Sequence, residues 1–88
     1  MIIRFHKNFE KQYKKFSSKK KNQIQKKLEL FLNNPFNPIL NNHPLKGKFL
    51  DYRSINITGD LRAVYKYSNG SEEECIFATI GSHSELYS

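Results

Sequence analysis

Four polar residues occupy positions where a fold commonly places working side chains: a turn, a strand and the end of the chain. They are Asp60, Arg62, His83 and Tyr87, which strand pairing can bring together. Transesterification of RNA requires a base for the 2′-hydroxyl proton, an acid for the leaving 5′-oxygen and a cation for the charge on the phosphate. Histidine and aspartate can transfer the protons, and the planar guanidinium of arginine can hold two phosphate oxygens. The set therefore predicts an RNA-cleaving site.

A second group of candidates comes from the loop that precedes the sheet region. His43 supplies another imidazole in a proline-rich stretch, where no core position requires one. Three cations are candidate contacts for the phosphate chain: Lys46, Lys48 and Arg53. Tyr87, or Phe49 from this loop, has an aromatic ring on which an unpaired base can stack. We interpret these residues as the RNA-binding part of the site.

Each candidate also has a structural explanation. An exposed loop histidine often has no function, and Asp60 follows a glycine in a turn, where aspartate is common for local reasons. Arg62 is alternatively a sheet-surface residue paired with Asp51 or Glu74. Tyr87 can simply pack the C-terminus onto the core, and a charged loop accounts for the lysines.

The carboxylates and the single cysteine argue against a metal site or a disulfide. A two-metal nuclease needs clustered carboxylates, whereas Asp60 is nearly alone and the consecutive glutamates at 72–74 point in alternating directions. Cys75 has no partner within the chain, which excludes an intramolecular disulfide and a cysteine-based zinc site. We therefore expect no metal and no cofactor. The unpaired cysteine and the lack of a recognisable signal peptide favour a cytoplasmic protein.

Positive charge is concentrated in the first part of the chain. The 88 residues carry a net charge of +7, and residues 1–50 hold twelve Lys or Arg against two Glu. Residues 51–88 hold three basic residues against six acidic ones. Such a surface attracts a polyanion, so nucleic acid, an anionic membrane and an acidic protein are all candidate partners. A lysine-rich helix face that is merely solvated explains the same pattern.

The hydrophobic pattern predicts one α+β domain spanning residues 1–88, a length that suits a single core. It indicates a short strand at 2–5 and two amphipathic helices around residues 9–16 and 24–32, separated by a capping position at Ser17-Ser18. A loop is expected at 33–44, and strands at 52–57, 61–67 and 75–80, with turns at 58–60 and Asn69-Gly70. The expected order is β-α-α-β-β-β, with a helical hairpin on a mostly antiparallel four-stranded sheet.

Several short motifs together resemble the YafQ branch of the RelE/ParE toxin superfamily. In order they are His43-Pro44-Leu45-Lys46-Gly47, Tyr52-Arg53-Ser54, Gly59-Asp60-Leu61-Arg62-Ala63-Val64-Tyr65 and Ile80-Gly81-Ser82-His83-Ser84-Glu85-Leu86-Tyr87. Each motif is weak separately, whereas their order is rather specific and the similarity covers nearly the whole chain. The resemblance implies a RelE-like fold and the toxin of a type II toxin–antitoxin system. It also implies ribosome-dependent mRNA cleavage that a cognate antitoxin silences.

The resemblance assigns roles by position. It places His43, Asp60 and His83 in the acid–base set, Arg62 on the phosphate and Tyr87 at the usual aromatic position. The implied partners are an antitoxin, mRNA and the ribosome with its 16S rRNA. No membrane partner is expected, and no DNA except through the antitoxin complex.

The chain departs from close YafQ-like toxins at two positions of the first long strand. Those toxins carry an acidic residue and a histidine where this chain has Ser54 and Asn56. Asparagine cannot transfer a proton at neutral pH, so the site has one titratable group fewer. Ser54 and Asn56 remain candidates for hydrogen bonds to RNA, and the sequence leaves open which histidine is the base.

Two other functions fit the sequence. A ParE-like toxin that inhibits DNA gyrase is one, although such relatives usually lack the C-terminal Gly-x-His motif that contains His83. The other is a basic RNA- or ribosome-binding module without nuclease activity, for which binding should weaken steeply with salt.

Overall fold

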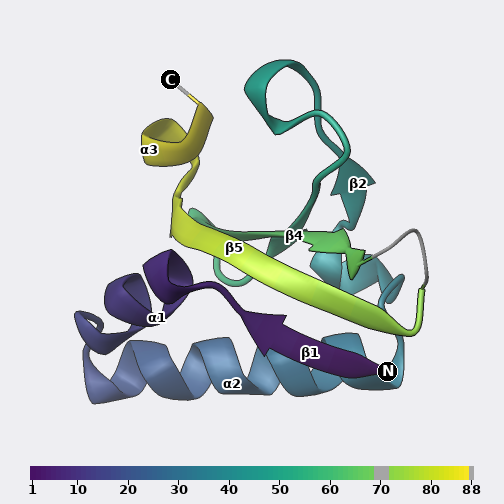
Figure 1. Ribbon diagram of the computed structural model, residues 1–88. Helices are drawn as coiled ribbons and strands as arrows, with labels where there is room; N and C mark the ends of the chain where they lie inside the picture. Colours follow the sequence, from purple (N-terminus) through teal and green to yellow (C-terminus); the bar gives the residue numbers. More distant parts are fainter. Residues whose placement is uncertain (69–71, 88) are drawn as a thin grey trace.

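The chain folds into one five-stranded sheet that separates two layers of other elements (Figure 1). This architecture is that of a computed structural model, which describes residues 1–68 and 72–87. The strands lie in the order β1-β5-β4-β3-β2, with β1 parallel to β5 and the other pairs antiparallel. Their bounds are β1 (Ile2–Phe5), β2 (His43–Pro44), β3 (Arg53–Asn56), β4 (Leu61–Tyr67) and β5 (Glu74–Ser82).

Two helices cover one face of the sheet, and a short helix lies on the opposite side (Figure 1). The pair comprises α1 (Lys7–Lys14) and α2 (Ser18–Asn33), and the short helix is α3 (His83–Tyr87). Two 3-10 turns, η1 (Pro38–Leu40) and η2 (Gly47–Phe49), shape the loop. Ser17 caps the N-terminus of α2, because its hydroxyl accepts a hydrogen bond from the N–H of Lys20 at 3.2 Å. None of the described helices is long and apolar enough to cross a bilayer.

Aromatic rings fill the core between the helices and the sheet. Phe31 of α2 contacts Tyr65 of β4 and Phe77 of β5 edge to face, with ring centroids 4.9 Å and 5.3 Å away. All three side chains are fully buried. Such aromatic pairs each contribute about 0.5–1.5 kcal/mol beyond the burial of their area. The core therefore fixes the middle of β4 and β5, the two strands that lead into the candidate site.

The other face of the sheet is buried as well. Side chains alternate along β3 and β4, so Ile55 and Ala63 belong to the helix-side core, whereas Ser54 and Val64 face away from it. Ser54 and Val64 are nevertheless fully buried. The loop that contains η2, together with α3, lies over this face (Figure 1).

The predicted fold class and the order of the predicted elements are confirmed, with two additions. His43 and Pro44, expected within a loop, form a fifth strand because they pair with Ser54 and Arg53. Residues 83–87, for which no element was predicted, form α3. The predicted turn at Asn69-Gly70 lies outside the described residues.

Candidate functional site

One cavity on the covered face contains four of the residues predicted for the site. It has a volume of about 410 Å³ and lies between the β2 region, β4 and α3. Its lining residues are Asn41, His43, Leu45, Arg62, His83 and Tyr87. Two imidazoles, one guanidinium and one phenol ring thus share a space within the usual size range of ligand pockets.

The segment Ser82-His83-Ser84-Glu85 fixes the start of α3 and so positions His83. The hydroxyl of Ser82 accepts from the N–H of Glu85 at 3.1 Å, and the carboxylate of Glu85 accepts from the N–H of Ser82 at 2.8 Å. These reciprocal bonds form a capping box. They also hold the pKa of the Glu85 carboxyl below its usual value, because they favour the charged form. The N–H of His83 donates to the carbonyl of Asp60 at 3.0 Å, which joins α3 to the turn before β4.

The backbone of Asn41 orients the ring of His43. Asn41 has a left-handed backbone conformation with φ 46°, which asparagine tolerates better than most residues. Nδ1 of His43 lies 2.8 Å from the carbonyl oxygen of Asn41. A carbonyl oxygen can only accept, so Nδ1 carries the proton and the neutral ring presents the lone pair of Nε2. His43 is therefore arranged to accept a proton.

The guanidinium of Arg62 is held against the turn that precedes β4. Its Nη1 donates to the carbonyl oxygens of Thr58 and Leu61 at 3.0 Å and 3.2 Å. Its Nη2 donates to the carbonyl oxygen of Gly59 at 3.2 Å. No described residue accepts a hydrogen bond from Nε, so part of the guanidinium is left for an anionic ligand. These contacts make Arg62 a cation of fixed position.

Tyr87 forms a wall of the cavity with its ring, while its hydroxyl is engaged elsewhere. The hydroxyl donates to Oγ of Ser54 at 2.7 Å. The ring contacts His83 and Phe49 edge to face, with centroids 4.9 Å and 6.2 Å away. Ser54 is completely buried, so the structure does not present its side chain to a ligand, and its contact with RNA stays a prediction. Ser54 instead anchors Tyr87.

Asp60 is not among the residues that line the cavity. Asp60 is exposed in the turn before β4. Its backbone carbonyl, and not its carboxylate, contributes to the site, because it accepts a hydrogen bond from the N–H of His83. The structure therefore does not bring the Asp60 carboxylate into the cavity with the two imidazoles.

Asn56 pairs across the strands with Arg62 and is half-buried. Its Oδ1 is buried, and no described residue donates a hydrogen bond to it. A buried polar atom without a partner costs about 1–3 kcal/mol. This buried Oδ1 is not presented to a ligand in the structure, so the hydrogen bond from Asn56 to RNA stays a prediction.

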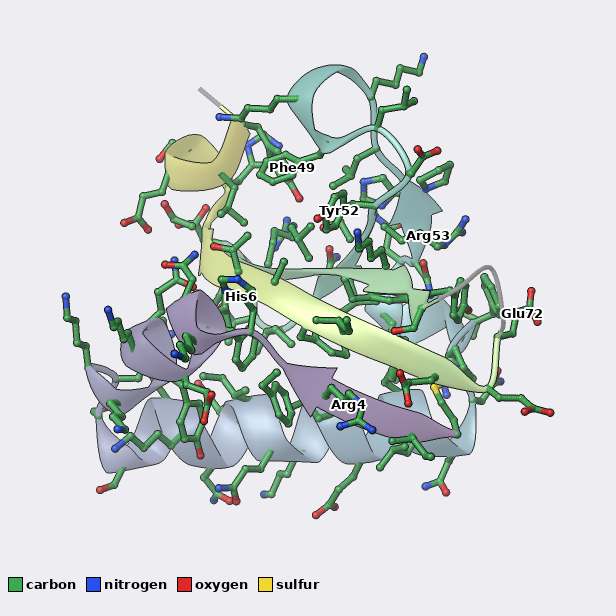
Figure 2. The ribbon with its side chains drawn as sticks, viewed as in Figure 1. Arg4, His6, Phe49, Tyr52, Arg53 and Glu72 are labelled. Atoms are coloured by element: carbon green, nitrogen blue, oxygen red, sulfur yellow. The ribbon has the colours of Figure 1, made fainter. Side chains whose placement is uncertain are left out.

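Arg53 lies on the opposite face of β3 from Ser54, because successive side chains of a strand alternate. Its Nε donates to Oδ1 of Asn42 at 2.8 Å, and its guanidinium lies 5.3 Å from the centroid of the Phe36 ring. Asn42 in turn donates to the hydroxyl of Tyr65 at 2.7 Å. Arg53 therefore supports the edge of the sheet near β2 (Figure 2) and does not line this cavity, so its contact with phosphate stays a prediction.

The lysines of the loop are exposed, as a contact with RNA would require. Lys46 and Lys48 flank Gly47, and Nζ of Lys48 lies 5.4 Å from the centroid of the Phe49 ring.

The alternative in which Arg62 pairs with Glu74 is wrong, since Glu74 forms an ion pair with Arg4 at 3.1 Å. Across residues 1–68 and 72–87, no group of three or more His, Cys, Asp or Glu side chains is arranged to hold a metal ion.

Three residues that shape the cavity were not predicted: Asn41 and Leu45 line it, and Glu85 caps α3. Glu85 belongs to a Ser-x-x-Glu capping box, a sequence signature from which the start of α3 could have been predicted. Asn41 carries a weaker signal, because a left-handed asparagine is recognised only once the course of the loop is known.

Comparison with known proteins places the whole chain in one family. Residues 1–88 match the model of the YafQ family, described as the bacterial toxin of a type II toxin–antitoxin system. No curated protein sequence matches the chain. Solved structures with the same fold include YafQ from E. coli strain BL21(DE3), with 23% identity and a TM-score of 0.79 over 98% of this chain and 97% of that one.

Two further solved structures extend the comparison. The E. coli DinJ-YafQ toxin-antitoxin complex contains a chain with 23% identity and a TM-score of 0.76, covering 98% of this chain and 96% of that chain. A metal-bound toxin from Helicobacter pylori has 30% identity and a TM-score of 0.70, with 99% of both chains covered. By sequence and by fold, this chain belongs to the YafQ family of bacterial type II toxin–antitoxin toxins.

Proposed function

We propose that this toxin is a ribosome-dependent endoribonuclease that cleaves mRNA, without a metal cofactor, and so inhibits translation. The observation that carries the proposal is the meeting of His43, Arg62 and His83 in one cavity of a YafQ-family chain. A base, an acid and a fixed cation are the three groups that transesterification of RNA needs.

His43 serves as the general base. Its Nδ1–H is bound to the carbonyl of Asn41, so the lone pair of Nε2 accepts the proton of the 2′-hydroxyl. The 2′-oxygen then forms a bond to the adjacent phosphorus.

His83 serves as the general acid in its protonated form. It donates a proton to the 5′-oxygen as the bond between that oxygen and phosphorus breaks, which leaves a 2′,3′-cyclic phosphate and a 5′-hydroxyl. Arg62 stabilises the charge on the phosphate through the part of its guanidinium that the turn carbonyls do not occupy. Asp60 has no part in this scheme, because it does not line the cavity.

The charge distribution supports the proposed partners. Eight of the twelve basic residues in positions 1–50 lie in α1 and α2, which supports a contact of these helices with 16S rRNA and so a toxin that works among the ribosomes of the cytoplasm. The structure of E. coli YafQ with DinJ supports a cognate antitoxin as the second partner. An acidic antitoxin segment would mask the basic surface.

The test is cleavage of a defined mRNA by the purified protein in EDTA, with and without programmed ribosomes. The wild type should cut only with ribosomes, and His83→Ala should lose about 100- to 10,000-fold in rate while keeping its fold. A message with 2′-deoxyribose at the cut site should resist, since it lacks the nucleophile. A folded His83→Ala protein that cuts at the wild-type rate contradicts the proposal. Salt-sensitive RNA binding without cleavage by the wild type identifies a binding module instead.

A further inference from the structure

A second cavity lies on the same side of the sheet as the candidate active site, and Phe49 forms part of its lining. Its volume is about 440 Å³, and its lining includes His6, Asn8, Lys48, Phe49, Tyr52 and Thr79. Figure 2 shows His6, Phe49 and Tyr52 grouped over the C-terminal half of β5. The mechanism proposed above uses none of these side chains.

Two aromatic rings and the ammonium group of Lys48 line this cavity. Phe49 and Tyr52 contact each other edge to face, with centroids 6.0 Å apart, and both are only partly buried. Nζ of Lys48 lies 5.4 Å from the centroid of Phe49, and Nζ of Lys66 lies 5.3 Å from that of Tyr52. Aromatic rings combined with cations are the chemistry by which proteins bind unpaired nucleotides.

His6 adds a hydrogen-bond donor to the cavity. Its Nδ1 accepts a hydrogen bond from the N–H of Asn8 at 3.0 Å, so the proton of the neutral ring is on Nε2. The ring is exposed. The lining residues include no carboxylate, so His6 and Lys48 together favour an anionic group such as a phosphate.

The two cavities share a wall. Phe49 lines the second cavity, and its ring packs against Tyr87, which lines the first. The Phe49–Tyr87 pair thus separates the cavity that contains Arg62 from the second cavity.

We propose that the second cavity is a nucleotide subsite, which takes an unpaired base next to the cleaved phosphodiester. The base stacks on Tyr52 and Phe49, and Lys48 and His6 bind the adjoining phosphate. The inference rests on the proposed nuclease function and extends it, because contacts at this cavity select among bases beside the cut.

The test is binding of a short, uncleavable 2′-O-methyl RNA, followed by fluorescence anisotropy, to wild type, Tyr52→Leu and Tyr52→Phe. Loss of the stacking ring should weaken binding by about 5- to 150-fold, whereas Tyr52→Phe should stay near the wild type. RNAs with one abasic nucleotide, placed at successive positions, locate the partner base. At one position the abasic RNA should bind wild type as weakly as intact RNA binds Tyr52→Leu, with no further loss when both changes are combined.

If Tyr52→Leu fails to fold, a substitution of the exposed Lys48 tests the same subsite. Lys48→Gln should weaken binding and lower the slope of log affinity against log salt by about one. Arg4→Gln removes the same charge on β1, away from both cavities (Figure 2), and should leave the affinity unchanged.

The binding experiment tests the nucleotide subsite, and the cleavage experiment tests the nuclease function, so the two hypotheses can be rejected independently. Wild-type affinity in Tyr52→Leu, equal losses on intact and abasic RNA, or no binding of the RNA by wild type overturns the subsite. A subsite that behaves as expected in a protein that never cleaves RNA overturns the nuclease function alone.

Discussion

The hydroxyl of Tyr87 donates a 2.7 Å hydrogen bond to Oγ of Ser54, a side chain with no exposed surface. This contact joins α3, at the end of the chain, to β3 in the sheet. It therefore holds α3, the helix of five residues that begins with His83, against the sheet.

Removing this bond should destabilise the fold without removing the wall of the cavity. Tyr87→Phe leaves the hydroxyl of Ser54 buried without a donor, so we expect a loss of about 1–2 kcal/mol in the free energy of unfolding. Ser54→Ala combined with Tyr87→Phe should cost less than the sum of the two single changes. Urea denaturation of the four proteins measures this coupling, and strictly additive costs would contradict it.

The capping box of α3 gives a second prediction, which includes a pH dependence. The folded pKa of Glu85 is lowered, so the ionised cap stabilises α3 above the pKa of a free glutamate, and this contribution is lost as the pH falls through the folded value. We expect faster amide exchange at Ser82 and His83 in Glu85→Ala, and slower RNA cleavage because His83 is less well placed. Glu85→Gln is the matched control, since glutamine also forms a capping box. Equal exchange in Glu85→Ala and wild type would exclude this role.

The loop before β2 should fix the tautomer of His43. ¹⁵N NMR of the neutral ring should show the proton on Nδ1 in the wild type, because that atom donates to the carbonyl of Asn41. Asn41→Gly keeps the left-handed backbone and the carbonyl, and should preserve this tautomer. Asn41→Val strains the same backbone and should cost about 1–3 kcal/mol of stability. A proton on Nε2 in the wild type would remove the argument for His43 as the base.

Burial should make the thiol of Cys75 unreactive in the native protein. Desolvation raises its pKa to about 11, so the thiol stays protonated at neutral pH. Because the folded pKa is raised, the stability that this group contributes is complete below the unfolded pKa and is lost as the pH rises toward about 11. A disulfide reagent at pH 8 should label Cys75 only at the rate of unfolding. Rapid labelling of folded protein would show that the side chain is accessible.

The fold was largely predictable because its signals are local. The apolar spacing of Phe9 and Tyr13, and that of Ile24 and Leu28, each mark one helix face, and the alternation from residue 61 marks β4. The pairing of His43 with Ser54 was not predictable, since a two-residue strand carries no periodicity of its own. The burial of Ser54 has the same origin, because its cover comes from Tyr87, 33 residues away.

The sequence predicted most of the residues that line the candidate site, but it did not predict the contacts that these residues make. His43, Arg62, His83 and Tyr87 do line one cavity, as their places before, on and after strands suggested. Asp60 and Arg53 do not line it, because one lies in the turn and the other on the opposite face of β3. Which face a strand residue occupies depends on the register of the neighbouring strands, which the sequence alone leaves undetermined.

The imidazoles of His43 and His83 should transfer the two protons of RNA cleavage. The direct measurement is the pH dependence of the single-turnover cleavage rate on programmed ribosomes, for wild type, His43→Ala and His83→Ala. A base and an acid predict a bell-shaped profile in the wild type, with the acidic limb lost in His43→Ala and the alkaline limb lost in His83→Ala. Bell-shaped profiles of unchanged shape in both variants would contradict the account.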